Sequence, residues 1–256
     1  MKKTLNIALL GKDFLLSGGT ELLRNLANAL LAVENDQQLR LFLLLPTKNK
    51  IDTYADLKGV LRKSAGQLLR QRTLSLPKQE PIFDANFLDY FRIIDGAIEY
   101  IEYNDTTGLV PALQKISADV VLPAAFSLGQ TFPYPWVGYI YDFQHKYFPS
   151  YFNPKECLTR DILFATMLRD AQAVIVNAKA VKSDINRFFP YSECEVFNLP
   201  FSAFPVTSWL EDDDPAQLQG YNLPERYFLI SNQFWIHKSH STAFQALSIL
   251  LNDPDY

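Results

Sequence analysis

The chain has 256 residues, of which 48% are hydrophobic and 20% are charged. This composition excludes an intrinsically disordered chain and is typical of a globular protein that buries a core. The formal net charge of -4 gives no support to nucleic-acid binding, which normally requires a basic surface. An anionic ligand would therefore have to be held by local groups.

The cysteines and the N-terminal segment bear on the compartment. The sequence contains two cysteines, Cys157 and Cys194, and without a secretory signal these fit free thiols in a reducing compartment. The start, MKKTLNIALLGKDF, has a short apolar run without a small-residue cleavage site, so it predicts a strand. No run of about 18 apolar residues occurs, and we expect a cytoplasmic protein without a membrane span.

The first forty-odd residues predict a parallel crossover. Residues 4–11 and 39–46 are short apolar runs, as in buried parallel strands. Between them, residues 20–33 carry leucines at helical spacing after a glycine loop. The order strand, helix, strand predicts a right-handed crossover in a doubly wound sheet.

Residues 48–78 differ in composition, with eight Lys or Arg against two Asp or Glu. Their apolar residues share one helical face, which predicts a basic amphipathic helix at about 53–72. Two interpretations remain open. The basic face is solvated, or it contacts an anionic membrane surface or a phosphorylated acceptor, which would place the protein at the inner face of the membrane.

The remaining elements alternate between strands and helices. Short apolar runs predict strands at 91–95, 97–101, 118–123, 135–140, 173–177 and 194–200, and helices are expected at about 107–116, 154–171 and 179–188. Proline, glycine and an acidic run at 203–222 predict a linker. After it, residues 226–232 predict a buried strand and residues 241–251 a helix. The fold class is α/β: a doubly wound Rossmann-like domain at 1–202, then the first strand-helix unit of a second α/β domain at 223–256.

Gly18 and Gly19 precede a helix and form the first candidate binding site. A backbone without side chains lets a ligand approach free N–H groups at a helix N-terminus, where the helix dipole favours phosphate. The spacing from the first strand does not fit the G-x-G-x-x-G pattern, and a plain tight turn is the alternative.

Asp142 and His145 follow the strand expected at 135–140 and form the second candidate. They lie in an aromatic stretch, at the carboxyl edge of the sheet where open α/β folds bind ligands. Such a pair can position a substrate hydroxyl or stabilise developing charge, and the aromatic rings can stack on a sugar. The alternative is that the two side chains form structural hydrogen bonds.

Lys238 comes behind the strand expected at 226–232, where a helix is expected to open. A cation at this place can meet a diphosphate, whereas a single Lys at a helix start is more often solvated surface.

Taken together, these features resemble the two-domain GT-B glycosyltransferases of family 4. The stretch YNLPERYFLISNQFWIHKSH at 221–240 is similar to the opening of that family's donor domain. The stretches IYDFQHKYFPSYF at 140–152 and VIVNAKAVKSDINRFFP at 174–190 resemble segments of its acceptor domain. The resemblance covers most of the chain, tightly at 137–199 and 221–247 and loosely at 46–110.

The resemblance implies retaining transfer of a sugar from a nucleotide-sugar to a hydroxyl of a glycan or lipid-linked acceptor, with no cofactor and no obligatory metal. It implies that Gly18 and Gly19 face the donor diphosphate and that Lys238 neutralises it in the transition state. Asp142 and His145 are then the candidate catalytic residues. His237 and Gln233 are further donor-side candidates.

Two departures from the family pattern limit the expected activity. Gln233 stands where the family commonly has an Arg, and the family's paired donor-binding glutamates lie beyond the second strand-helix unit. We therefore expect this truncated chain to be inactive alone. The alternatives are a non-catalytic remnant or module that binds a glycan or a partner, and a nucleotide-binding enzyme of another doubly wound family, against which the glycine spacing argues.

Overall fold

The structure is a computed structural model that describes residues 4–14, 18–33, 38–49, 79–81, 91, 96–105, 107–200, 202, 220–224 and 227–253. The chain divides into two compact units. The first contains Met1–Asp142 and Arg160–Phe204, and the second contains Phe143–Thr159 and Pro205–Tyr256.

The predicted crossover at the start of the chain is confirmed. Strand β1 spans Thr4–Leu10, helix α1 spans Gly18–Ala32 and strand β2 spans Gln38–Asn49. β1 pairs in parallel with the first part of β2, from Thr4 opposite Gln38 to Leu10 opposite Leu44. The apolar residues of both strands are therefore buried in the middle of the sheet, as their sequence pattern indicates.

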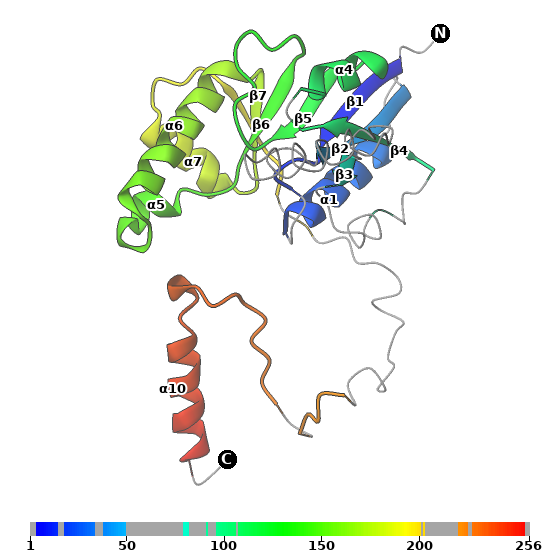
Figure 1. Cartoon of the computed structure of the whole chain (residues 1–256). Coiled ribbons are helices and arrows are strands. Elements are labelled where there is room, and N and C mark those ends of the chain that lie inside the picture. Colours follow the sequence, from blue (N-terminus) through cyan, green and yellow to red (C-terminus); the bar gives the residue numbers. More distant parts are fainter. Residues whose placement is uncertain are drawn as a thin grey trace, which may run out of the picture. The chain divides into compact units, whose positions relative to one another are not determined.

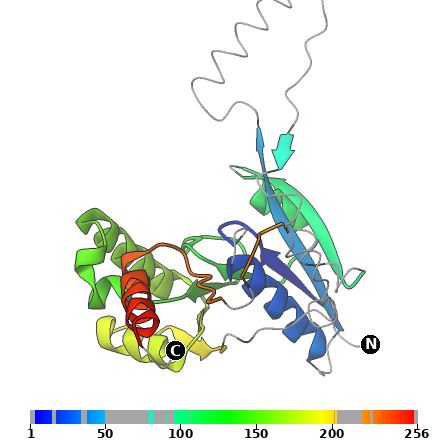
Figure 2. The ribbon, with the colours of Figure 1, turned by 90° about the horizontal axis from the view of Figure 1, so that it is seen from below.

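The strands form an eight-stranded sheet in the order β3-β2-β1-β5-β6-β7-β8, with β4 also paired to β2 (Figure 1). The further strands are β3 Gln79–Pro81, β4 Ile98–Asn104, β5 Val120–Ala124, β6 Trp136–Ile140, β7 Ala173–Val176 and β8 Glu195–Asn198. All predicted strands from 97 to 200 are confirmed. β3 was not predicted, since three residues carry no periodic signal, and it runs antiparallel to the far end of β2 (Figure 2).

Three further helices of the first unit connect the later parallel strands. They are α4 Leu109–Lys115, α6 Pro154–Asp170, which begins in the second unit, and α7 Lys179–Phe188. All three were predicted. Their lengths of two to five turns fit the crossover connections that a parallel sheet requires.

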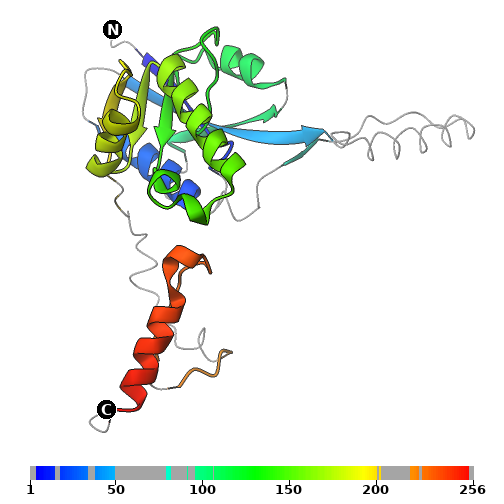
Figure 3. The same ribbon diagram turned by 90° about the vertical axis from the view of Figure 1, so that its left-hand side faces the viewer.

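Helices α1 and α6 cover opposite faces of the sheet. A Cβ atom on Gly138 of β6 would lie 2.5 Å from the Sδ atom of Met167, so α6 packs directly on β6 (Figure 3). The next residue, Tyr139, packs edge-on against Phe14 and joins the apolar cluster that contains the leucines of α1. Because successive strand residues face opposite sides, α1 and α6 lie on different faces. The sheet is therefore flanked by helices on both faces, consistent with the predicted Rossmann-like fold.

Some sequence predictions fall outside the described residues. These are the basic helix at 53–72, all but the first residue of the strand at 91–95, and most of the linker at 203–222. Within the linker, the described residues 220–222 form an exposed turn.

The C-terminal segment corrects one prediction and confirms another. Residues 227–232 do not form the buried strand that was expected, and Leu229 in their centre is 81% exposed. A strand needs a neighbour for its backbone groups, and no described residue pairs with this segment. The expected helix is present as α10 His240–Leu251, preceded by the short 3-10 helix η3 Ile236–Lys238.

The helices of the described ranges include none of the length and apolar character that a membrane span requires. The longest of them, α6, has 17 residues.

Candidate functional site

The carboxyl edge of the sheet contains a cleft at the point where the strand order reverses. The chain leaves β1 toward β2 and β4 on one side, whereas β5 lies on the other side of β1. Open α/β sheets bind ligands at such a switch point. Here a cleft of about 510 Å³ is lined by Lys12, Asp13, Ala125, Phe126, Tyr141 and Leu163. These residues follow β1, β5 and β6, with Leu163 contributed by α6.

Lys12 places a cation in this cleft. Its Nζ atom lies 2.8 Å from the Oδ1 atom of Asp105, which follows β4. The same atom lies 5.3 Å from the ring centroid of Phe126, within the range of a cation–π contact. Both charged side chains are about one quarter to one third exposed, so the ion pair lies within reach of a ligand.

Asp13 stands beside Lys12 in an unusual backbone conformation. Its φ angle is 66°, in the left-handed region that residues with a side chain rarely adopt. Burial raises the pKa of its carboxyl above the ordinary value, Lys12 opposes this rise, and Asp105 adds to it. Strained backbone and a perturbed carboxyl in a cleft are both features that concentrate at functional sites.

Tyr103, near the end of β4, adds a buried hydroxyl to this region. The residue is 4% exposed, and its hydroxyl has no hydrogen-bond partner among the described residues. The pKa of the phenol is raised, first by burial and then by the negative charges of Asp105 and Asp13. The phenol therefore stays protonated and can act as a hydrogen-bond donor.

Asp142, a predicted site residue, follows β6 and holds an arginine against the wall of the cleft. Its Oδ1 atom lies 2.5 Å from an NH group of Arg160 on α6. The guanidinium of Arg160 lies 5.1 Å from the ring centroid of Tyr141, a residue of the cleft. Asp142 itself does not line the cleft, and it contacts Arg160, whose guanidinium lies over the Tyr141 ring.

His145 lies on the short helix α5 Gln144–Tyr147, in the second unit. It is 2% exposed, with its ring stacked on Phe143 and edge-on to Phe152. The ring is thus covered by aromatic neighbours and does not line the carboxyl-edge cleft.

Gly18 and Gly19 begin helix α1, and only Gly19 is confined by its surroundings. A Cβ atom on Gly19 would lie 2.8 Å from the Cα atom of Phe14, whereas a Cβ on Gly18 would meet nothing within 4 Å. The hydroxyl of Thr20 donates a hydrogen bond to the carbonyl of Phe14 at 3.2 Å. Gly19 therefore allows the loop after β1 to pack against the start of α1.

The donor-side candidates lie in the second unit, on the segment before α10. Lys238 and His237 belong to η3, and both are exposed. Gln233 accepts a hydrogen bond from the indole Nε1 of Trp235 at 2.6 Å. Lys238 was expected to open the helix, but α10 begins two residues later, after Ser239 in a left-handed conformation.

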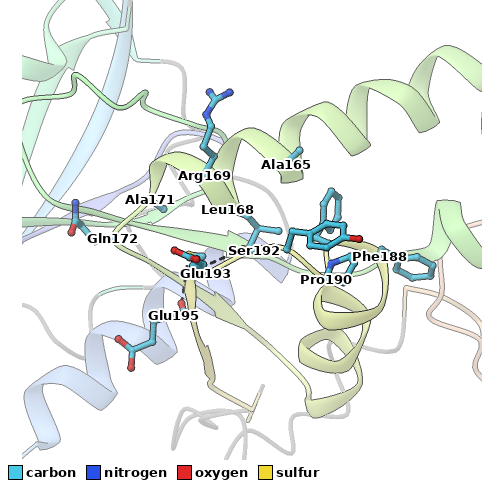
Figure 4. A pocket seen from close by; sticks show the side chains of 13 residues that line it. Ala165, Leu168, Arg169, Ala171, Gln172, Phe188, Pro190, Ser192, Glu193 and Glu195 are labelled. Carbon is cyan, nitrogen blue, oxygen red and sulfur yellow. Dashed lines mark hydrogen bonds between the residues drawn. The ribbon is translucent and has the colours of Figure 1, made fainter.

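A larger hollow lies at the opposite, amino edge of the sheet. Its volume is about 790 Å³, and its lining runs from the end of α6 to the start of β8 (Figure 4). Among its residues, Tyr191 is 96% exposed, and burial raises the pKa of the Cys194 thiol. A thiol with a raised pKa is a poor nucleophile, and this edge is not where parallel sheets bind substrates. The smaller cleft is therefore the better candidate.

No group of three His, Cys, Asp or Glu side chains in the described part of the chain is placed to hold a metal ion.

Sequence reasoning missed Lys12, Asp13, Tyr103, Asp105 and Phe126. A signal was available for most of them, because Lys12, Asp105 and Phe126 each follow closely on a predicted strand. The carboxyl-edge rule that selected Asp142 applies equally to them. The adjacency of β1 and β5, which brings these loops together, is not contained in any local pattern.

Comparisons with protein-family models, with curated proteins and with solved structures gave no match to this chain.

Proposed function

We propose that the first unit is the acceptor-side domain of a GT-B glycosyltransferase of family 4, and that its carboxyl-edge cleft holds a sugar of the acceptor. The observation that carries this proposal is the cleft at the switch point between β1 and β5. Its lining combines two aromatic rings with a carboxyl and an ammonium group. Aromatic faces stack on sugar rings, and polar groups at fixed positions select hydroxyls.

In this role the groups of the cleft have distinct tasks. Phe126 and Tyr141 supply flat apolar faces, and the Asp142–Arg160 pair keeps the Tyr141 ring in place. Asp13 accepts a hydrogen bond from an acceptor hydroxyl. The nucleotide-sugar is the donor substrate, with Gly18, Gly19 and Lys238 as candidate diphosphate contacts.

A second candidate function is a non-catalytic module that binds a glycan. One observation favours it: Gln233, His237 and Lys238 are exposed, on a segment that does not form the strand expected to support them. Both functions use the same cleft for the sugar.

Titration of the isotope-labelled protein with oligosaccharides, followed by amide NMR shifts, tests the proposal. We expect shifts at Lys12, Phe126 and Tyr141, with the amides of Tyr191 and Cys194 at the other edge unchanged. Shifts confined to the amino edge, or none with any oligosaccharide, would contradict both functions. A second titration with nucleotide-sugars separates them, because only the glycosyltransferase predicts shifts at Gly18 and Gly19.

A further inference from the structure

The charged groups of the carboxyl-edge cleft determine whether a neutral or an acidic sugar fits there. Lys12 is the cation among the described residues that line the cleft, and Asp105 already lies 2.8 Å from its Nζ atom. Asp13 adds a second carboxyl beside the same ammonium group. The net charge of Lys12, Asp105 and Asp13 is negative when both carboxyls are ionised, and it is zero when Asp13 carries its proton.

An anionic ligand would enter this cleft at a disadvantage. A phosphate or carboxylate approaching Lys12 would have to compete with Asp105 and would meet the repulsion of Asp13. The nearby Arg160 is engaged with Asp142 at 2.5 Å and lies over the Tyr141 ring. The positive charge of Arg160 is therefore already balanced by Asp142 and does not compensate for the repulsion.

A neutral ligand rich in hydroxyls meets the opposite situation. Carboxylate oxygens accept hydrogen bonds from sugar hydroxyls, and the Lys12 ammonium can donate one while it stays paired with Asp105. The buried phenol of Tyr103, whose hydroxyl has no partner among the described residues, lies close enough to Asp105 and Asp13 to feel both charges. The phenol does not line the cleft, but it keeps its proton beside these two carboxyls.

We propose that the cleft selects uncharged sugars, and that Asp13 and the Lys12–Asp105 pair exclude acidic ones. This inference rests on the proposed glycan-binding function and adds the substrate class. Asp13 is the specificity-determining carboxyl, because it both accepts the hydroxyl and repels an anion. Asp105 has a separate task, which is to neutralise Lys12 so that this cation does not recruit phosphorylated or uronic-acid sugars.

The test uses the full chain on an array of immobilised glycans that includes neutral, uronic-acid and phosphorylated members. We expect the parent protein to bind neutral glycans and to bind their acidic counterparts at least about 10-fold more weakly. A difference of about 10-fold in affinity corresponds to the loss of one charge-assisted hydrogen bond. Asp13→Asn should weaken neutral binding by about 10-fold or more, because a carboxylate acceptor is lost. Asn is chosen since it tolerates the positive φ angle at this position.

Asp105→Asn provides the sharper readout. Released from its partner, Lys12 becomes available to an anion, so binding of acidic glycans should rise while binding of neutral ones changes little. The matched control is Glu195→Gln, which removes one carboxylate at the amino edge of the sheet and should leave the ratio unchanged. Preference of the parent for acidic glycans, or an unchanged ratio in Asp105→Asn, would overturn this inference alone. Failure to bind any glycan would instead overturn the proposed function.

Discussion

Strand β1 and residues 227–232 have similar apolar sequences but adopt different structures. β1 reads TLNIALL and the later segment reads YFLISN, and both were predicted as buried strands. β1 is paired on both sides, with β2 and β5, and its Leu9 is fully buried. In the later segment Phe228 is 67% exposed and Leu229 is 81% exposed. An apolar run thus becomes a strand only where neighbouring strands take its backbone hydrogen bonds.

The difference also bears on the two predicted binding regions. The loop after β1 is fixed by packing on both of its ends, through Leu10 in the sheet and through Gly19 at α1. The loop that carries Lys238 follows the unpaired segment. The rings of Phe234 and His240 pack on each other across it with their centroids 4.8 Å apart, but Lys238 itself is exposed. Groups that bind or catalyse need to be held by a rigid scaffold, which the first loop has.

The largest expected effect is a difference in the free energy of unfolding between variants of Leu9 in β1 and of Leu229 in the later segment. Leu9→Ala should lower the free energy of unfolding by about 2–5 kcal/mol, since it leaves a cavity in a close-packed strand. The matched variant Leu229→Ala should change it by less than about 0.5 kcal/mol, because an exposed side chain loses little on truncation. Urea unfolding followed by circular dichroism measures both. Equal losses would show that residues 227–232 are packed in solution, and the comparison would fail.

The second prediction extends the comparison to two histidines. His145→Ala should lower stability by about 2–3 kcal/mol, seen as a drop of several degrees in the thermal midpoint, because its ring is packed between aromatic neighbours. His237→Ala, on the exposed η3, serves as the control and should melt like the parent. If His145→Ala keeps its midpoint but binds glycans more weakly, His145 belongs to the acceptor site after all.

The third prediction sharpens the description of the loop after β1. Gly19→Ala should cost about 1–3 kcal/mol, because the new methyl group would lie 2.8 Å from the Cα atom of Phe14. Gly18→Ala has open space and should stabilise α1 by up to about 1 kcal/mol, as expected for Gly to Ala in a helix. Thermal unfolding of the two variants beside the parent measures the difference. Similar midpoints for both would mean that the loop does not pack on α1.

The sequence predicted the fold of the first unit well because its signals are local. Apolar runs marked the strands from β1 to β8 apart from β3, and leucine spacing marked α1. Consecutive strands usually lie side by side in a sheet, and this tendency places β2 beside β1. The failure at 227–232 has a physical cause, since the same local pattern says nothing about whether a neighbouring strand is present.

The candidate site was predicted less well, because it depends on which loops meet. Asp142 was found by its place after β6, yet its partner Arg160 lies 18 residues further on, in the middle of a helix. The pairing of Lys12 with Asp105 requires β4 and β1 to flank β2, a fact of sheet order. The positive φ angle of Asp13 has no sequence signal, because Asp occurs far more often in ordinary conformations.

The smallest expected effect concerns Asp13 and has a defined dependence on pH. Burial raises the pKa of its carboxyl above the ordinary value of 3.8, so the folded protein holds this proton more tightly than the unfolded chain does. The stabilisation from that proton is complete below the unfolded pKa and is lost as the pH rises through the folded pKa. Ionised Asp13 therefore costs stability at neutral pH, where the cleft needs its charge.

Asp13→Asn removes this cost, and the variant should be slightly more stable than the parent at pH 7. The gain should shrink as the pH falls toward about 3, where the parent carboxyl is protonated in both states. Asn also suits a positive φ angle, but that benefit does not depend on pH, so the slope of the stability difference isolates the carboxyl. Urea unfolding at several pH values measures it. A difference that is flat with pH would mean that the Asp13 carboxyl is as well solvated in the fold as in the unfolded chain, and the loop after β1 would then be no more enclosed than the exposed segment with which it is compared.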